Sequence, residues 1–161
     1  MSMEYGLLGK KLGHSFSKEI HAMIADYDYR LYETDEDGVK ELMTKKNFKA
    51  INVTIPYKET VMPYLDYISE NAKKIGSVNT VVNKDGKLYG YNTDFAGLEG
   101  LIKRTGVEIK DKKVLILGTG GTSKTAYAVS NDMGAGEIYK VSRHEGAGVI
   151  TYNEAYEKHT D

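Results

Sequence analysis

The sequence predicts an α/β protein, and three observations support this. Short apolar runs rich in β-branched and aromatic residues alternate with stretches of helical periodicity along almost the whole chain. A glycine-rich turn separates one such run from a helical stretch, and Asp85-Gly86 lies between two others. The alternation favours parallel β-α-β units over an all-α or all-β fold.

Composition excludes several classes of protein. The 161 residues suit one compact domain or two small ones. A net charge of −1, from 22 Lys and Arg against 23 Asp and Glu, argues against a nucleic-acid partner. The chain has no cysteine, which excludes disulfides, Cys-ligated zinc and a thiolate nucleophile, and we predict no metal site. No apolar run approaches the roughly 20 residues that span a bilayer, and the N-terminus lacks a secretory signal, so we expect a soluble cytoplasmic protein with no membrane partner.

The first half predicts three β-α units. We expect a strand at Tyr5–Gly9, then a polar loop and a helix that Ser17 caps, with Ile20, Met23 and Ile24 on its apolar face. A strand over 27–33, a helix over 36–46 and a strand over 50–55 follow. These units predict parallel pairing.

The middle of the chain predicts a helix, a hairpin and a domain boundary. We expect a helix over 59–75, then strands over 78–83 and 88–91 joined at Asp85-Gly86, a sequence typical of hairpin turns. A helix over 94–105 ends in the polar segment 106–113. That segment predicts two domains, 1–106 and 107–161.

The second domain starts with a strand, a glycine-rich turn and a helix. A strand is expected over 113–117, and further strands over 137–142 and 149–152. The turn carries Gly118, Thr119, Gly120, Gly121, Thr122 and Ser123. Gly-x-Gly at the start of a helix lets the backbone approach a diphosphate, and small Ser123 replaces the third glycine. The context predicts a Rossmann-type nucleotide site, with a tight structural turn as the alternative.

The residues after strand 137–142 indicate the cofactor. A site that prefers NAD usually places Asp or Glu there, against the ribose 2′-hydroxyl. This chain has Ser142 and Arg143, and a guanidinium suits a 2′-phosphate, so we predict NADP. Lys124 is a candidate for a second phosphate contact. The alternative is that both cations only face water.

Four polar clusters precede the boundary: Gly13 to Ser17, Asn52 to Lys58, Gly76 to Thr80, and Gly90 to Asp94. Each lies at a strand end or helix start, where ligands bind in parallel α/β sheets. Ser15 and Ser17 at a helix N-terminus suit a carboxylate. If Lys58 and Asp94 meet, they form an acid/base pair, and Thr54 and Asn79 suit substrate hydroxyls. Each assignment has an alternative. Lys58 could only face water, Ser17 and Asp94 could only cap helices, and Thr54 and Asn79 could only form hydrogen bonds with the backbone.

In this order the clusters resemble the shikimate dehydrogenase family over nearly the whole chain. The resemblance implies an N-terminal three-layer α/β substrate-binding domain followed by the start of a Rossmann-type domain for NADP. It also implies interconversion of 3-dehydroshikimate and shikimate in chorismate biosynthesis. It implies that Ser15 and Ser17 bind the substrate carboxylate, that Thr54, Asn79 and Asp94 bind ring hydroxyls, and that Lys58 is the acid/base paired with Asp94.

The resemblance also implies cofactor residues. Gly118 to Lys124 would hold the diphosphate and Ser142 and Arg143 the 2′-phosphate, with Glu70 near the cofactor. Departures from the family pattern are His144 after Arg143, Ser77 in place of alanine, and Thr119 and Thr122 in the glycine turn.

The short segment after the turn limits the expected activity. Only 40 residues follow Gly121, which suffices for one mononucleotide half of a dinucleotide fold. We therefore expect an N-terminal portion of a longer enzyme, inactive alone, whose second domain is poorly ordered or associates with another copy as a homodimer. Alternative functions are a quinate/shikimate dehydrogenase and a non-catalytic module that keeps the substrate cleft.

Overall fold

The computed structural model describes residues 4–159. The chain divides into two compact units, Met1–Thr93 and Asp94–Asp161. The segment 94–105 thus groups with the second unit. The functional domain boundary expected between residues 106 and 107 stays a prediction.

The first unit is built on a mixed six-stranded sheet of order β2-β1-β3-β5-β6-β4. The strands are β1 Tyr5–Gly9, β2 Tyr29–Glu33, β3 Ala50–Val53, β4 Tyr67–Ile68, β5 Thr80–Lys84 and β6 Lys87–Tyr91. β1 pairs in parallel with both β2 and β3, as the β-α units predict. β5 runs antiparallel to β3 and β6, and β4 runs parallel to β6.

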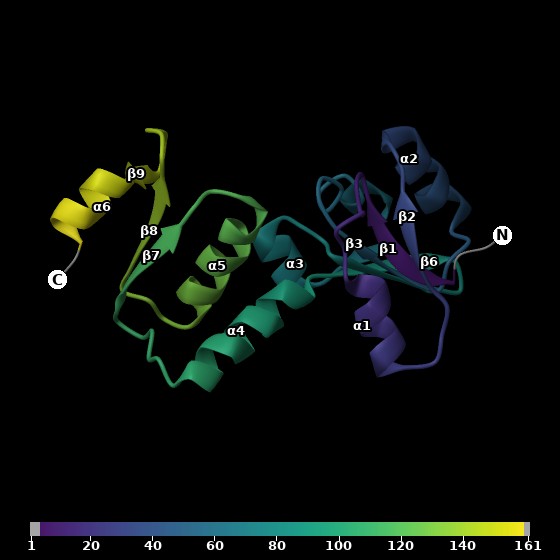
Figure 1. The fold of residues 1–161 in the computed structure, drawn as a ribbon, viewed down its shortest axis with the longest axis horizontal. Coiled ribbons are helices and arrows are strands. Elements are labelled where there is room, and N and C mark those ends of the chain that lie inside the picture. Colours follow the sequence, from purple (N-terminus) through teal and green to yellow (C-terminus); the bar gives the residue numbers. More distant parts are fainter. Residues whose placement is uncertain (1–3, 160–161) are drawn as a thin grey trace. The chain divides into compact units, whose positions relative to one another are not determined.

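Helices lie on both faces of this sheet. α1 (Ser17–Ile24) lies on one face and α2 (Glu36–Lys45) on the other (Figure 1). Neighbouring residues of β1 point to opposite faces, so Leu8 packs in the cluster under α2, whereas Leu7 packs with Leu12 and Tyr29. The predicted three-layer α/β arrangement is confirmed.

The larger core lies under α2. Val39, Leu42 and Met43 form the buried stripe of this helix and pack on strand residues Leu8 and Ile51. Asp35 caps the helix, because its carboxylate accepts a hydrogen bond from Gly38 N at 3.0 Å. A cap of this kind typically stabilises a helix by about 1 kcal/mol.

The hairpin expected at Asp85-Gly86 is confirmed. Both turn residues have positive φ, 52° at Asp85 and 82° at Gly86, which matches the twist of the flanking strands. Asn83 secures the turn, since its Oδ1 accepts from Gly86 N at 2.9 Å.

The long helix expected over 59–75 is wrong. The segment instead forms a 3-10 turn at Met62–Tyr64, strand β4, and α3 (Glu70–Ile75). Tertiary pairing overrides the periodicity here: Asp66 accepts from Leu88 N at 2.7 Å, and β4 joins the edge of the sheet beside β6.

The expected capping of α1 by Ser17 is also wrong, since Phe16 is the N-cap residue and no side chain caps the helix. The expected apolar residues Ile20, Met23 and Ile24 do lie on this helix, but their side chains are exposed. None of the residues of α1 is buried. Instead, α1 contacts the sheet through His21, whose ring stacks on Tyr29 with centroids 3.8 Å apart.

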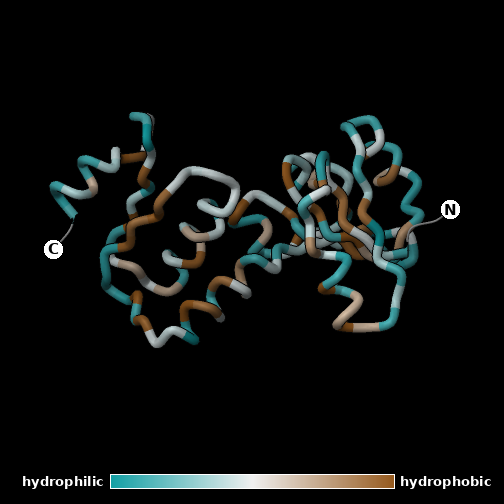
Figure 2. Tube along the Cα trace, viewed as in Figure 1, coloured by the Kyte–Doolittle hydropathy of each residue, from teal (hydrophilic) through white to brown (hydrophobic). Residues whose placement is uncertain are grey.

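The second unit contains a three-stranded parallel sheet of order β7-β8-β9. Its elements are α4 Thr93–Thr105, β7 Lys113–Leu117, α5 Gly121–Asp132, β8 Glu137–Ser142, β9 Val149–Thr151 and α6 Tyr152–Lys158. Hydrophobic stretches lie in its strands and also along α4 (Figure 2). Thr151 and Glu154 form a capping box at the start of α6. This strand-helix-strand arrangement confirms the start of a Rossmann-type fold.

No helix within residues 4–159 is both long and apolar enough to cross a membrane.

Candidate functional site

Leu12, in the loop before α1, and Thr54, in the second polar cluster, both approach Gly9, the last residue of β1. A Cβ on Gly9 would lie 2.5 Å from Leu12 Cδ2 and 2.8 Å from Thr54 Cγ2, so only glycine lets both side chains approach. Thr54 N also donates to Leu8 O at 2.9 Å. The loop before α1 and the loop after β3 are thereby held against the same strand end.

Ser15 and Ser17 are close together at the start of α1. Their hydroxyl oxygens are 3.0 Å apart, with Ser15 as donor, and Ser17 N donates to Ser15 Oγ at 3.2 Å. Ser15 N donates to Leu12 O at 2.8 Å, which holds this loop close to Gly9. Two hydroxyls beside the N-terminus of a helix suit an anionic ligand.

Lys58 lies on a tightly held segment after β3. Tyr57 N donates to Thr54 O at 3.0 Å, and the buried Tyr57 phenol donates to Thr34 O at 2.6 Å. Val78 N donates to Lys58 O at 2.9 Å. The main chain at Lys58 is therefore bonded directly to the loop that carries Asn79.

Asn79 lies between the second and fourth clusters. Val53 N donates to Asn79 O at 2.8 Å, and Asn79 N donates to Tyr91 O at 3.0 Å. Its side-chain Oδ1 accepts from Thr93 N at 2.9 Å. The structure thus brings three of the four predicted clusters into direct hydrogen-bond contact.

Ser77, one departure from the family pattern, has a partner in the same region. Asn92 Nδ2 donates to Ser77 O at 3.0 Å and to Ser77 Oγ at 3.1 Å, and both residues are buried. The Ser77 hydroxyl therefore supplies an acceptor for a buried amide, in addition to its carbonyl oxygen.

Asp94 and Glu70 complete the set of residues predicted to bind the substrate or lie near the cofactor. Asp94 is the first residue of the second unit, so its pairing with Lys58 stays a prediction. Glu70 begins α3 and forms an ion pair with Lys73 at 2.9 Å. The hydrogen bond and charge of Lys73 lower the pKa of the Glu70 carboxyl.

The glycine-rich turn in the second unit connects β7 to α5. Gly118 has φ +116°, a conformation that side chains disfavour, and its N–H donates to Val141 O at 2.9 Å. Gly120 is the N-cap of α5, and a Cβ added at Gly118 or Gly120 would meet no atom within 4 Å. A cavity of about 360 Å³ opens on this turn, lined by Ile116, Leu117, Gly118, Gly120, Gly121, Thr122, Ser123 and Ala126.

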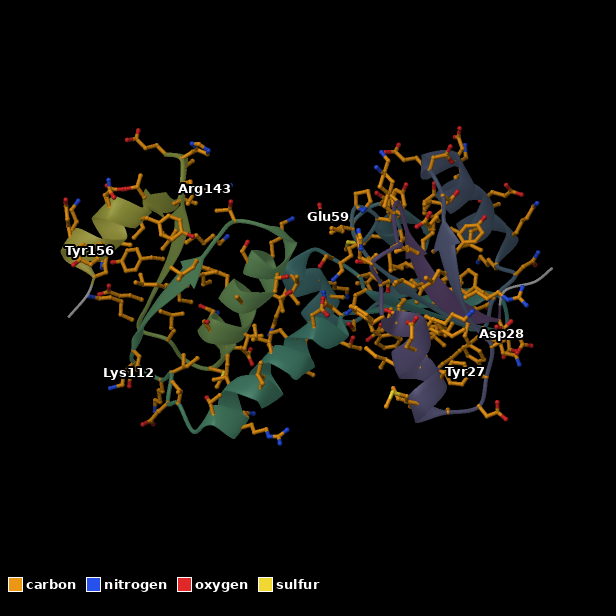
Figure 3. The ribbon with its side chains drawn as sticks, viewed as in Figure 1. Tyr27, Asp28, Glu59, Lys112, Arg143 and Tyr156 are labelled. Atoms are coloured by element: carbon orange, nitrogen blue, oxygen red, sulfur yellow. The ribbon has the colours of Figure 1, made fainter. Side chains whose placement is uncertain are left out.

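A second cavity joins the turn to the end of β8. It measures about 280 Å³ and is lined by Gly118, Thr119, Gly120, Ser142, Arg143, His144 and Tyr152. Figure 3 shows Arg143 just beyond β8. The backbone-lined turn beside a guanidinium fits the diphosphate and 2′-phosphate of NADP. The first turn of α5 also carries Lys124, which is exposed.

Sequence reasoning assigned no role to several residues around both sites. His144 and Tyr152 line the second cavity, and Tyr152 carries no sequence signal for that place. Tyr29, Asn52 and Thr80 are bonded to one another beside Asn79. Asn52 and Thr80 lie opposite each other on β3 and β5, a relationship that only the strand register reveals.

Comparisons with known proteins agree with this arrangement. Residues 7–81 match the family described as the shikimate dehydrogenase substrate binding domain. A relative named shikimate dehydrogenase (NADP(+)), from Clostridium beijerinckii, is 42% identical over 147 residues, which cover 86% of this chain and 54% of the relative. The chain thus spans about half the length of the curated relatives it matches.

Solved structures give the same result. A chorismate mutase/shikimate 5-dehydrogenase fusion protein from Clostridium acetobutylicum matches 98% of this chain and 62% of its own, with a TM-score of 0.86 and 37% identity. Shikimate 5-dehydrogenase from Thermus thermophilus, in complex with NADP(H) and shikimate, matches 98% of this chain and 66% of its own, with a TM-score of 0.78 and 27% identity. On its sequence, its fold and these matches, the chain belongs to the shikimate dehydrogenase family.

Proposed function

We propose that the first unit binds shikimate and 3-dehydroshikimate and that the second unit binds the adenosine half of NADP. Together they would serve a dehydrogenase that interconverts the two acids. The relatives are longer than this chain, so the complete reaction is a proposal for a protein that contains it.

In the first unit, Ser15 and Ser17 donate hydrogen bonds to the substrate carboxylate, and Thr54, Asn79 and Asp94 bind ring hydroxyls. The carboxylate charge is balanced by the N-terminal dipole of α1 and by hydroxyl donors, without an arginine. This assignment is supported by the 3.0 Å contact between the two serine hydroxyls.

Lys58 acts as the acid/base at the reacting oxygen. Its ammonium gives a proton to the carbonyl oxygen of 3-dehydroshikimate in reduction, and its neutral amine takes a proton from the hydroxyl of shikimate in oxidation. Asp94 holds the ammonium in place. NADP, when bound, supplies or accepts the hydride.

In the second unit, the main chain of Gly118 to Lys124 binds the diphosphate, and Ser142 and Arg143 bind the 2′-phosphate. Arg143 lines the same cavity as Gly118 and Gly120, which supports a single continuous nucleotide site. Glu70 remains a proposed neighbour of the cofactor, although Lys73 already pairs with it.

One hydrogen bond carries the proposal for the substrate. Val78 N donates to Lys58 O at 2.9 Å and so connects the loop of Asn79 to the loop of Lys58. This bond fixes the backbone that presents a candidate acid/base next to a candidate hydroxyl ligand. The two loops belong to different sequence clusters, so their contact is a property of the fold.

The test is calorimetric titration of the 161-residue chain with shikimate. We expect saturable binding that Lys58→Ala weakens. Lys40→Ala is the matched control, because Lys40 is an exposed lysine on α2, and it should bind as the wild type does. Failure of the wild-type chain to bind shikimate, with the fold intact by circular dichroism, would contradict the proposal.

A further inference from the structure

The orientation of the Asn79 carboxamide decides what it offers to a ligand. Its oxygen and its NH2 group occupy nearly the same space but have opposite hydrogen-bonding roles, so turning the group over would exchange acceptor for donor. The residue is only 8% exposed, which leaves few water molecules to compensate. Oδ1 accepts from Thr93 N, which can only donate, at 2.9 Å.

A second donor reaches the same oxygen from Thr80. Thr80 Oγ1 donates to Asn79 Oδ1 over 3.0 Å. A hydroxyl can also accept, so the direction of this bond depends on its other partner. That partner is Asn52 Nδ2, which only donates and lies 3.2 Å from Thr80 Oγ1. Because Thr80 accepts there, its own proton is directed to Asn79.

The orientation of Asn52 depends in turn on Tyr29. The Tyr29 phenol donates to Asn52 Oδ1 at 2.8 Å, which leaves the Asn52 amide nitrogen for Thr80. If Asn52 were turned over, Tyr29 would have to accept and Thr80 would turn its proton toward Asn52. The direction of the bond between Thr80 and Asn79 is therefore tied to proton donation by Tyr29.

Tyr29 is well placed to be a constant donor. It is 5% exposed, and burial, together with neighbouring Tyr27, raises the pKa of its phenol, so it stays protonated in the working range. The His21 ring stacks on it at an interplanar angle of 13°. Figure 3 shows Tyr27 close to α1, the helix that carries His21.

We infer that Tyr29, Asn52 and Thr80 form a polar relay that positions the carboxamide of Asn79 for substrate. The three are positioning residues, because they act through Asn79. The inference rests on the proposed function insofar as Asn79 is taken to bind a ring hydroxyl.

The test compares Thr80→Val, which keeps the shape of the side chain, with Thr80→Ser, which keeps its hydroxyl. Calorimetry with shikimate should show about 2- to 10-fold weaker binding for Thr80→Val, the usual effect of one hydrogen bond, and recovery for Thr80→Ser. In an Asn79→Ala background, Thr80→Val should have no further effect. Equal losses in both backgrounds, or no loss in either, would overturn the relay.

The side-chain amide resonances of Asn79 provide a readout that needs no ligand. Thr80→Val should shift them and Thr80→Ser should restore them, while the remaining backbone amide spectrum reports an intact fold. Tyr29→Phe, which removes the donor at the far end, should shift them in the same direction. If wild type fails to bind shikimate, the proposed function fails and these resonances alone decide: unchanged signals in both variants would refute the relay.

Discussion

The main-chain N–H of Thr93 donates to the side-chain oxygen of Asn79 over 2.9 Å. This bond joins the first residue of α4 to the loop before β5, two places 14 residues apart in the sequence. It gives Asn79 a fixed orientation and sets the residue preceding Asp94 beside the proposed substrate loops. The site in the first unit is therefore held by main-chain donors as well as by side chains.

Gly9 should tolerate no side chain. In Gly9→Ala, the added methyl would overlap Leu12 and the stiff Thr54 side chain, at 2.5 Å and 2.8 Å. We expect a loss of about 1 to 3 kcal/mol in the free energy of unfolding, typical of overpacking, measured by urea denaturation. Gly13→Ala is the control, because a Cβ there meets nothing within 4 Å. Equal stability of the two variants would show that Gly9 is not a close-packed position.

Arg143 should distinguish phosphorylated from unphosphorylated ribose. The probe is 2′,5′-ADP, compared with 5′-AMP, which lacks the 2′-phosphate. Arg143→Gln should weaken binding of 2′,5′-ADP by about 10-fold, as expected for loss of one hydrogen bond to a charged group, and change 5′-AMP binding little. Arg104→Gln, at an exposed arginine of α4, should leave both affinities unchanged. An equal effect of Arg143→Gln on both nucleotides would argue against 2′-phosphate recognition.

Stability at high pH should report the burial of Tyr29. The pKa of its phenol is raised in the folded chain by burial and by Tyr27, so unfolding releases a proton at alkaline pH. This contribution to stability is intact below the ordinary tyrosine pKa of 10.0 and is lost as pH rises above it. The wild type should lose up to about 1.4 kcal/mol more per pH unit than Tyr29→Phe does. Parallel urea midpoints for the two proteins above about pH 10 would contradict this account.

Local patterns are sufficient for much of the fold. The hairpin follows from Asp85-Gly86, because a turn with positive φ at both residues strongly prefers this sequence. The strand Tyr5–Gly9 is a short run that is buried almost along its whole length, and the helix beginning at Glu36 has an apolar period that matches its burial. The glycine turn is recognisable because the strand before it and the helix after it are themselves predictable.

Other features depend on contacts between distant residues. The segment 59–75 has helical periodicity, but pairing with β6 takes Tyr67 and Ile68 into the sheet. The expected cap at α1 is absent because Ser17 is the first residue of the helix, one position past the N-cap, and its hydroxyl accepts a hydrogen bond from Ser15.

In the candidate site, too, some residues can be predicted from local sequence and others only from contacts between distant segments. Cluster sequences suggest Thr54, Lys58 and Asn79, whereas the roles of Asn52 and Thr80 emerge only when β3 and β5 are placed in register. The sequence around one residue does not indicate which hydroxyl donates a hydrogen bond to which side-chain amide.

The most direct test of the account is an amide-resonance titration of the 161-residue chain with shikimate. We predict saturable shifts concentrated at Ser15, Thr54, Lys58 and Asn79, with the amides of β8 unchanged. Absence of saturable shifts, or shifts confined to other parts of the chain, would contradict the proposal that these loops form the substrate site.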